Sequence, residues 1–430
     1  MYVYTTPGVS VLYLRQSGAT ERSPVRLVVL GGGAMGRITV RALAEDERVS
    51  EVVVGDMNVA AAERAVAALG VGREKVSVVA CDVRDIDATA HLLRGAGAVL
   101  NATDYTFNLE VMRAALAARV HYADLGGLFH MTRRQYALDE AFREAGIVAA
   151  LGIGSTPGVT NLLARVAVDG LDRVERLDVR IGCGDARPAS GHFVPPYSIR
   201  TIFDECTLPP MVYSDGAWSQ AAPMSGAEEI EFPAPVGRAA AMYTLHSEVA
   251  LFPVSFGERG LRHASFKIAF PPAFLSQLRL LVDLGLASTE PIVARGEARG
   301  ATVRVAPREV MAALLAAQQS AAANGEASND PSEPSDCDVL RVIAEGTRNG
   351  APVRLVEEMI VAPYHPWGVG AGDIDTGTPL AIAGILLASG AAQVTGAHGA
   401  ELIFEPLAFL RELARYGMRA TETVTHTLAE

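Results

Sequence analysis

A glycine-rich turn near residue 31 constrains the fold of this chain more than any other feature of the sequence. The apolar run Val25–Leu30 leads directly into GGGAMG at residues 31–36, which matches G-x-G-x-x-G between a predicted strand and a predicted helix. Gly31 permits the tight turn, Gly33 lets an anionic ligand approach the backbone, and Gly36 lets the helix pack close to the strand. Amides at the helix start would face that anion. The predicted contacts of this turn are Gly31, Gly33, Ala34, Met35 and Gly36.

An acidic residue after the second predicted strand supports dinucleotide binding over a plain structural turn. The run Glu51–Gly55 ends at Asp56, 20 residues after Gly36. At this spacing a carboxylate reaches the ribose hydroxyls of a bound dinucleotide. Because Met57 and Asn58 follow Asp56 where a basic residue would be needed, nothing nearby would neutralise a 2′-phosphate. The sequence therefore predicts NAD as the cofactor, with NADP as the alternative.

Residues 25–157 have the pattern of a doubly wound parallel sheet. Short runs rich in Val, Ile, Leu and Ala alternate with helix-like stretches, as in α/β domains whose sheets are covered on both faces. We predict a Rossmann domain over residues 25–157, preceded by an extension over residues 1–24. The predicted strands are Val25–Leu30, Glu51–Gly55, Val76–Ala80, Ala98–Asn101, Val120–Asp124 and Ile147–Leu151.

The hydrophobic pattern changes in the second third of the chain. Apolar and polar residues alternate over residues 177–183 and 266–270, which is typical of strands with one buried face. The pair Asn349-Gly350 lies between two apolar runs and predicts a tight hairpin. We therefore predict a second α+β domain with a mixed sheet over residues 158–364, and a mobile loop over the polar, acidic residues 324–336.

The last part of the chain is predicted to be helical. Thr378-Pro379 would place a capping hydroxyl before a proline at the first helical position, and Gly390 follows the apolar run as a stop. Glu405-Pro406 and Gly417 bracket a final helix in the same way. Residues 365–430 are therefore expected to form a C-terminal helical segment.

Charge and composition exclude several classes of protein. The 430 residues include 37 basic and 49 acidic side chains, so the net charge is −12 and binding to nucleic acid or to anionic membranes is not expected. No apolar run approaches the roughly 20 residues that span a bilayer, and no export signal is evident, so we expect a cytoplasmic protein. No metal site is predicted. The cysteines lie far apart and are predicted to be reduced structural thiols: Cys81, Cys183, Cys206 and Cys337.

Polar segments follow three of the predicted strands, where ligands of a doubly wound sheet bind. They are NATDYTFN at 101–108, DLGG at 124–127 and GIGSTPGVTN at 152–161. Thr156-Pro157 suits a helix cap and first helical residue. The amides of Gly158 and its neighbours would then be free for a ligand, although ordinary helix-start chemistry would look the same.

The combination of GGGAMG, Asp56, NATDYTFN, YADLGG and GIGSTPGVTNLLA resembles the saccharopine dehydrogenase superfamily, which includes saccharopine reductases, lysine 6-dehydrogenases and carboxynorspermidine dehydrogenases. The similarity is dense over residues 25–170 and returns from Asp375. It implies an N-terminal Rossmann domain, a middle domain with much of the substrate site and the dimer contacts, and a C-terminal segment that packs back on the first domain. It also implies a homodimer and a small amino-acid substrate.

The resemblance assigns roles to residues at the strand ends. It places Asn101 and Ala102 beside the nicotinamide ribose, and Tyr105 and Asp124 at the substrate amine. Asn101 could instead be a strand-end cap. Asp124 could instead be a surface carboxylate or a helix cap.

Candidates in the middle domain lie in polar clusters without regular periodicity. Arg200 could clamp a substrate carboxylate or form a surface ion pair. His246 or Glu248 could serve as a general base, although a buried histidine without chemistry is an equally simple interpretation of His246. Tyr243 and Glu248 complete the predicted substrate contacts. The predicted catalytic residues are Asp124, Tyr105 and His246.

The sequence and the resemblance together predict an NAD-dependent oxidoreductase that acts on a C–N bond of an amino acid. Lysine 6-dehydrogenase activity is the leading version. Saccharopine- or carboxynorspermidine-type reductive amination is the alternative. A non-catalytic NAD-binding sensor or scaffold is the alternative from another class of protein.

Overall fold

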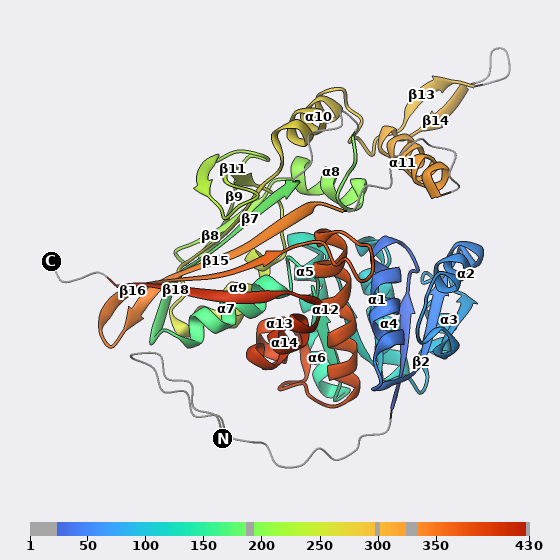
Figure 1. The fold of residues 1–430 in the computed structure, drawn as a ribbon, viewed down its shortest axis with the longest axis horizontal. Coiled ribbons are helices and arrows are strands. Elements are labelled where there is room, and N and C mark those ends of the chain that lie inside the picture. The colour runs from blue at the N-terminus through green and yellow to red at the C-terminus, as the bar shows by residue number, and fades with distance from the viewer. Residues whose placement is uncertain (1–23, 186–192, 297–301, 324–333, 427–430) are drawn as a thin grey trace.

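A computed structural model describes residues 24–185, 193–296, 302–323 and 334–426 of the chain (Figure 1). The predicted N-terminal extension lies outside these residues, apart from Pro24. The same holds for most of the predicted mobile loop at 324–336. Its last residue, Asp336, is the first residue of a long strand, so the loop ends earlier than predicted.

The first domain is built on a seven-stranded sheet in the order β17-β6-β5-β4-β1-β2-β3, and every neighbouring pair is parallel. Six of these strands are those predicted, which confirms the Rossmann architecture. Most residues of β1, β4, β5 and β6 are buried because helices cover both faces of the sheet, whereas β3 at its edge has no fully buried residue. The strands are β1 (Val25–Leu30), β2 (Val49–Asp56), β3 (Val76–Ala80), β4 (Ala98–Asn101), β5 (His121–Asp124), β6 (Val148–Leu151) and β17 (Gly396–Gly399). The helices are α1 (Ala34–Glu45), α2 (Val59–Ala67), α3 (Ile86–Leu93), α4 (Asn108–Ala118), α5 (Leu128–Tyr136) and α6 (Asp139–Glu144).

The second domain is a mixed sheet in the order β10-β11-β12-β7-β15-β16-β18, with β8 and β9 attached to β12. Only β12 and β7 are parallel neighbours. The predicted hairpin is confirmed: Asn349 and Gly350 have φ of 54° and 75°, as a two-residue turn that matches strand twist requires. The strands are β7 (Arg173–Asp185), β8 (Met211–Ser214), β9 (Ala217–Gln220), β10 (Glu228–Glu231), β11 (Arg238–Tyr243), β12 (His263–Ala269), β15 (Asp336–Arg348), β16 (Ala351–Val361) and β18 (Arg419–His426).

The C-terminal segment returns to the first domain, but it is not wholly helical. It contributes β17 to the first sheet and β18 to the edge of the second. Neither strand, GAHG in β17 or RATETVTH in β18, has a clear alternation of apolar and polar residues. Their pairing is therefore decided by the neighbouring strand. The helices of this segment are α12 (Ala371–Ala388), α13 (Ala400–Ile403) and α14 (Pro406–Leu413).

Helix α12 ties the C-terminal segment to α1. The predicted start at Thr378-Pro379 is wrong, because α12 begins at Ala371 and Pro379 lies inside it. Gly377 packs directly on α1: a Cβ there would lie 2.5 Å from Cβ of Ile38, and its carbonyl accepts the hydroxyl of Thr39 at 2.9 Å. The prediction for the last helix is confirmed, with Pro406 at the first position of α14.

One continuous cluster of buried hydrophobic side chains runs through both domains. Helix α7 packs against β15 and β16, and α12 contacts α1 as well as β15. In Figure 1 the first domain, blue to teal, and the second sheet, green and orange, meet where α12 stands. None of the helices in the described part of the chain combines the length and hydropathy needed to cross a bilayer. The remaining helices are α7 (Val159–Asp169), α8 (Ile199–Thr207), α9 (Glu248–Phe256), α10 (Pro272–Asp283) and α11 (Pro307–Ala323).

Candidate active site

The glycine turn between β1 and α1 has the geometry of a phosphate cradle. Gly31 has φ of +92°, and a Cβ there would lie 2.8 Å from the carbonyl oxygen of Ala102. A Cβ on Gly36 would lie 1.9 Å from the Gly31 carbonyl oxygen, so both positions demand glycine. At Gly33, in contrast, no atom lies within 4 Å of the Cβ position. No side chain caps α1, so its first amides face the open space in front of Gly33.

Asp56 at the end of β2 borders the same turn. Its Oδ2 accepts the backbone N–H of Gly32 at 2.7 Å, and its Oδ1 accepts that of Asn58 at 2.7 Å. These two bonds fix the carboxylate beside the turn and leave lone pairs for further donors. The residues present therefore fit a dinucleotide, with the pyrophosphate at Gly33 and the adenosine ribose at Asp56.

Asn101 at the end of β4 is occupied by its own loop. Its side-chain amide donates to Oδ1 of Asn108 at 2.9 Å, and its Oδ1 accepts the hydroxyl of Thr103 at 2.7 Å. This geometry favours the alternative in which Asn101 caps the end of its strand. Ala102 lies against Gly31, as a contact of the cofactor turn should.

Asp124 at the end of β5 is fully buried and holds two loops together. Its carboxylate accepts the amides of Gly126 at 2.8 Å and Gly152 at 2.7 Å. It also accepts the hydroxyl of Tyr122 at 2.7 Å and the side-chain amide of Gln135 at 2.5 Å. Burial raises the pKa of Asp124. Because four donors already use its lone pairs, the geometry favours a positioning role over contact with a substrate.

We expect Asp124→Asn to lower both the stability of the fold and the rate of turnover. An asparagine offers one acceptor oxygen and turns an N–H₂ toward donors, so at least one buried donor loses its partner at a cost of about 1–3 kcal/mol. Urea unfolding of the variant should show this loss, and turnover should fall much more than dinucleotide affinity. An unchanged unfolding midpoint and an unchanged rate would contradict the assignment of Asp124 as an organiser of these loops.

Tyr105 links the first domain to the second. Its hydroxyl donates to Oδ2 of Asp204 on α8 at 2.7 Å, and Asp204 is held by Arg308 at 2.7 Å on its other oxygen. Burial and the neighbouring Asp204 raise the pKa of Tyr105, so the phenol is a hydrogen-bond donor at neutral pH. Neither Asp204 nor Arg308 was among the predicted site residues.

His246 lies between two carboxylates in the interior. Nδ1 is 2.9 Å from Oε2 of Glu248 and Nε2 is 3.6 Å from Oε1 of Glu205, while the ring stacks on Phe266 with centroids 3.7 Å apart. Glu248 also accepts the hydroxyl of Thr160 at 2.9 Å. The structure thus brings the two predicted residues His246 and Glu248 together with Glu205, which the sequence did not reveal.

The electrostatics of this group favour a protonated His246 beside an ionised Glu248. Burial raises the pKa of Glu205 to about 7, against the effect of His246. Burial alone would lower the pKa of His246, but the carboxylates of Glu248 and Glu205 outweigh it and raise the pKa. Burial would raise the pKa of Glu248, yet His246 lowers it. Groups tuned in this way are suited to general acid–base chemistry.

The segment that follows β6 differs from the prediction. Helix α7 begins at Val159, with Gly158 rather than Thr156 as its N-cap, because the Gly158 amide donates to Oδ1 of Asn161 at 3.0 Å. That amide is therefore not free for a ligand. The hydroxyl of Thr156 instead donates to Glu248. Gly158 adopts a φ of +125°, a conformation that glycine reaches without strain.

A second buried acidic group lies near the start of α12. Asp375 accepts the hydroxyl of Ser155 at 2.6 Å, and burial together with Asp338 raises its pKa well above the usual range. Burial raises the pKa of Asp338 to about 6. The thiol of Cys183 lies beside Asp338, and burial raises its pKa also. No local motif marks these residues; they come from four separate segments.

Two predicted substrate contacts lie elsewhere. Arg200 forms an exposed ion pair with Glu309 at 2.5 Å, which is the surface alternative we held open. The ring of Tyr243 lies 4.5 Å from the ammonium of Lys267, which in turn is 2.8 Å from Glu228. In the described part of the chain, no three His, Cys, Asp or Glu side chains are grouped as a metal site requires.

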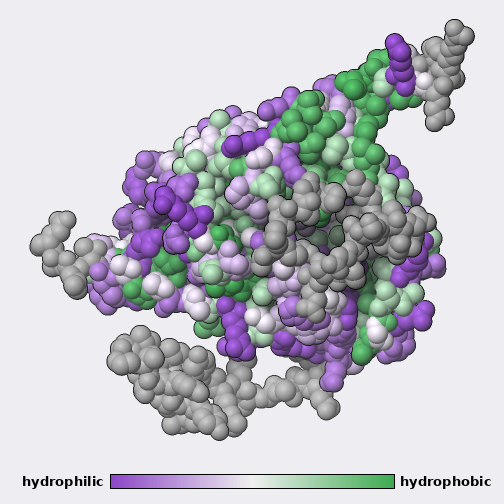
Figure 2. Space-filling model, turned by 45° about the horizontal axis from the view of Figure 1, so that its top comes forward, coloured by the Kyte–Doolittle hydropathy of each residue, from purple (hydrophilic) through white to green (hydrophobic). Residues whose placement is uncertain are grey.

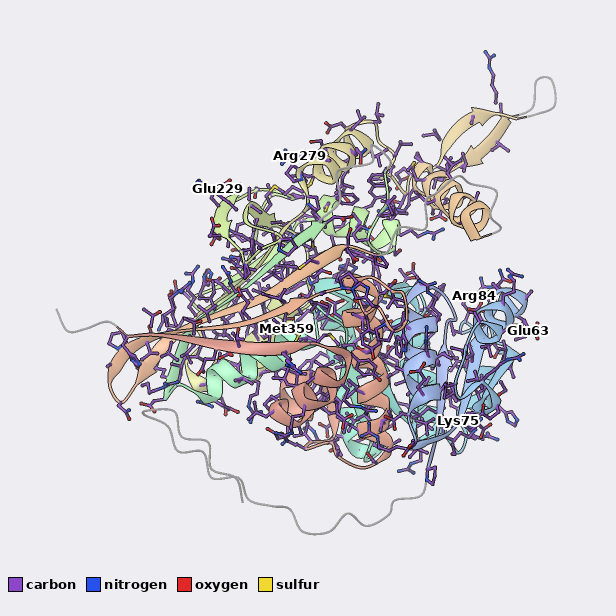
Figure 3. All side chains as sticks on the ribbon, viewed as in Figure 1. Glu63, Lys75, Arg84, Glu229, Arg279 and Met359 are labelled. Carbon is purple, nitrogen blue, oxygen red and sulfur yellow. The ribbon has the colours of Figure 1, made fainter. Side chains whose placement is uncertain are left out.

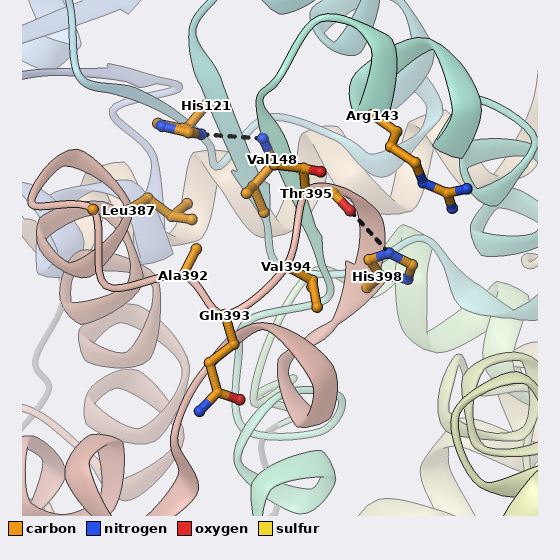
Figure 4. A pocket seen from close by; sticks show the side chains of 10 residues that line it. His121, Arg143, Val148, Leu387, Ala392, Gln393, Val394, Thr395 and His398 are labelled. Carbon is orange, nitrogen blue, oxygen red and sulfur yellow. Dashed lines mark hydrogen bonds between the residues drawn. The ribbon is translucent and has the colours of Figure 1, made fainter.

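A surface cavity of about 640 Å³ lies at the amino-terminal ends of strands β5 and β6, away from the glycine turn (Figure 4). It is lined by His121 and Val148, the first residues of β5 and β6, and by Gln393, Thr395 and His398. Ligands of doubly wound sheets bind beyond the carboxyl ends of the strands, so this cavity is not the dinucleotide site. In Figure 3, Glu63 and Arg84 mark the side of the first domain that faces away from the second sheet.

Comparison with known proteins agrees with this arrangement. The family model described as "Saccharopine dehydrogenase NADP binding domain" matches residues 27–150. Carboxyaminopropylagmatine dehydrogenase of Synechocystis is 24% identical over 424 residues, which cover 93% of this chain and 98% of that protein. Carboxynorspermidine synthase of Vibrio alginolyticus is 24% identical over 312 residues, 67% of this chain and 72% of that protein.

Among solved structures, saccharopine dehydrogenase (L-Glu forming) of Saccharomyces cerevisiae superposes with a TM-score of 0.66. It shares 16% identity, over 93% of this chain and all of that one, so the likeness is one of fold. The strand order, the glycine cradle and the match of residues 27–150 to the nucleotide-binding domain model support a relationship to the saccharopine dehydrogenase superfamily.

Proposed function

We propose that this protein is an NAD(P)-dependent oxidoreductase that joins a carbonyl compound to an amine by reductive amination. The observation that carries the proposal is the pairing of an open phosphate cradle at Gly33 with the buried His246–Glu205–Glu248 group at the junction of the two domains. The first holds a dinucleotide and the second moves protons.

The chemistry divides between the cofactor and the chain. The amine nitrogen attacks the carbonyl carbon, water leaves, and an imine remains. A bound reduced nicotinamide would supply the hydride that converts the imine carbon to that of a secondary amine. The chain must hold the two substrates together, pass the two protons that the amine nitrogen loses to the departing oxygen, and deliver one further proton from solvent to the product nitrogen. Glu205 and His246 are suited to these transfers because burial raises the pKa of Glu205 to about 7 and the carboxylates of Glu248 and Glu205 raise the pKa of His246.

Buried carboxyl groups favour a cationic amine as one substrate. Five of them lie where the two domains meet: Asp204, Glu205, Glu248, Asp338 and Asp375. Carboxylates in a poorly solvated site are stabilised by cationic partners. Two similar proteins are named for carboxylated derivatives of agmatine and norspermidine, which supports an amine with a second basic group. These names favour reductive amination over lysine oxidation, the version we had placed first.

A coupled assay tests the function. Carbonyl acids are paired with agmatine, with short diamines or with lysine, and oxidation of NADH or NADPH is followed at the absorbance of the reduced nicotinamide. We expect oxidation only when both a carbonyl acid and a polyamine-type amine are present, with the secondary amine identified by mass. Reduction of NAD by lysine alone would favour the lysine dehydrogenase alternative. Tight binding of NAD without turnover on any pair would favour a sensor.

For the cofactor we propose NAD over NADP, because Asp56 would repel a 2′-phosphate and Met57 and Asn58 would not neutralise it. The family model that matches is named for NADP, so the choice needs a direct measurement. We expect the wild type to bind NADH at least 10-fold more tightly than NADPH in fluorescence titrations. The double substitution Asp56→Ser, Met57→Arg should reverse the order. Tighter binding of NADPH by the wild type would overturn this preference.

A further inference from the structure

The two sides of the His246 ring have different surroundings. At Nδ1, Oε2 of Glu248 lies 2.9 Å away, and the other oxygen of Glu248 accepts the hydroxyls of Thr156 and Thr160. With the imidazole protonated, three donors therefore surround this carboxylate, which is fully buried. The Nδ1 side of the ring is closed to any further partner.

The Nε2 side of the ring is open. Oε1 of Glu205 lies 3.6 Å from Nε2, which is longer than a hydrogen bond. Nε2 therefore keeps a position for a hydrogen-bond partner, and Oε1 keeps its lone pairs. The ring of Phe266 stacks on the imidazole with centroids 3.7 Å apart and fixes its plane. A third group is thus able to bond to Nε2 and Oε1 together.

The hydroxyl of Tyr197, a residue that the sequence did not single out for the site, holds the other oxygen of Glu205. It donates to Oε2 at 2.5 Å, and Glu205 is buried on helix α8. Because Oε2 is engaged in this way, Oε1 stays turned toward Nε2 of His246. One donor rather than three leaves the Glu205 carboxyl able to carry a proton.

The segment that carries Tyr197 is restrained by its neighbours. Pro195 and Pro196 limit the backbone just before it. Phe193 stacks on Phe274 of α10, with ring centroids 5.2 Å apart and an angle of 8° between the planes. Figure 2 shows hydrophobic side chains gathered over α10, the helix to which this segment is attached. This packing restricts where the Tyr197 ring can lie.

Other ionisable groups around Glu205 are engaged or neutral. Asp204, beside it on α8, is paired with Arg308 of α11 at 2.7 Å. Burial raises the pKa of the thiols of Cys206 and Cys183, so both stay protonated. Helix α11 follows α10 through a two-stranded hairpin, β13 (Ile292–Arg295) and β14 (Thr302–Val305).

The Tyr197 hydroxyl also affects the proton affinity of Glu205. Burial raises the pKa of Glu205 to about 7, against the charge of His246 and the hydroxyl of Tyr197, which both lower it. The carboxylates of Glu248 and Asp204 raise the pKa further. Because the hydroxyl bonds to the ionised form and favours it, removing the hydroxyl would keep the proton on Glu205 to higher pH.

We propose that Tyr197 is a positioning residue of the active site, and that protons are exchanged with the substrate nitrogen between Nε2 of His246 and Oε1 of Glu205. The inference rests on the proposed function and adds which side of the group reacts. Each proton that leaves the amine nitrogen breaks an N–H bond and forms an O–H bond on Oε1. The proton then passes to the departing oxygen, so the group regains its starting charge.

Magnetic resonance of the histidine rings tests the proposal without substrate. The signal of His246, one of nine histidines, is identified by its loss in His246→Gln. Tyr197→Phe keeps the ring and removes the hydroxyl, so Glu205 stays neutral to higher pH and supports the imidazolium less. We therefore expect the titration midpoint of His246 to fall by roughly 0.5–1 pH unit in Tyr197→Phe.

Tyr416→Phe is the matched control, because Tyr416 is also partly buried but packs on Tyr364 and Trp367. It should leave the His246 midpoint unchanged. In the enzymatic assay, the acid limb of the kcat profile should move to higher pH by about one pH unit in Tyr197→Phe, the size expected for losing a hydrogen bond to a charged group. KM for NADH should stay the same, since the dinucleotide binds at the glycine turn.

An unchanged His246 midpoint in Tyr197→Phe would overturn the proposal, whatever the rate of the variant. A shifted midpoint with an unchanged acid limb would also overturn it, because the proton of Glu205 would then take no part in turnover. A shifted midpoint in a protein that turns over no carbonyl–amine pair would refute the proposed function instead. Tyr197 would then remain the residue that orients Glu205.

Discussion

Gly33→Val should abolish dinucleotide binding and leave the fold intact. Gly33 has φ of −70°, which valine adopts, and no atom lies within 4 Å of the Cβ position, so the apoprotein has room for the side chain. The same side chain fills the space that a pyrophosphate needs. Losing two charge-assisted bonds from backbone amides, at roughly 1.5–3 kcal/mol each, weakens binding by about 100-fold or more. Calorimetric titration with NADH measures the change.

Gly70→Val is the matched control for this experiment. Gly70 is in the same domain and also has no atom within 4 Å of its Cβ position, but it is remote from the glycine turn. We expect wild-type affinity from this variant and equal thermal stability of both variants without cofactor. If Gly33→Val bound NADH as tightly as the wild type does, the assignment of this turn as a phosphate-binding site would be wrong. The proposed redox function would then be wrong as well.

His246→Gln should lower kcat by about 10²- to 10⁴-fold, the usual contribution of a general acid–base group. The substitution keeps a polar side chain between Glu205 and Glu248 but removes the group that exchanges a proton. Because the dinucleotide binds at the glycine turn, its affinity should change little. His263→Gln is the matched control, since His263 on β12 is paired with Asp178 and is not part of the group. An unchanged kcat in His246→Gln would contradict the assignment.

The pH dependence separates proton transfer from a structural role. Glu248 raises the pKa of His246, so the protonated imidazole persists to higher pH than in free histidine and turnover that needs it as an acid falls only above that pKa. Glu248→Gln removes this charge. The alkaline limb of the kcat profile should therefore move to lower pH. A profile that keeps its midpoint while the rate drops would identify Glu248 as a structural residue only.

The cofactor half of the protein could be predicted from the sequence because its signals are local. The glycine turn, the strand before it and Asp56 lie within 32 residues, and Gly31 and Gly36 each meet a backbone requirement that no other residue meets. The hairpin at Asn349-Gly350 was predictable for the same reason. The helix starts predicted at Thr156-Pro157 and Thr378-Pro379 are wrong. The hydroxyl of Thr156 donates to Glu248, and α12, which packs on α1, already begins at Ala371.

The substrate half was predictable only in part. His246 and Glu248 are two residues apart and were identified together, but their partner Glu205 lies 41 residues before His246 on another element. Asp375, Asp338 and Ser155 are likewise brought together from distant segments. Arg200 was drawn instead into an ion pair with Glu309, which no pattern near residue 200 indicates.

The sequence by itself determined six strands of the first sheet, the phosphate cradle and the hairpin, because hydrophobic periodicity and glycine geometry act over a few residues. Only the tertiary structure decided which acids surround His246 and where β17 and β18 pair. Proton affinities and strand partners depend on burial and on charges from remote segments, and those are set when the chain is packed.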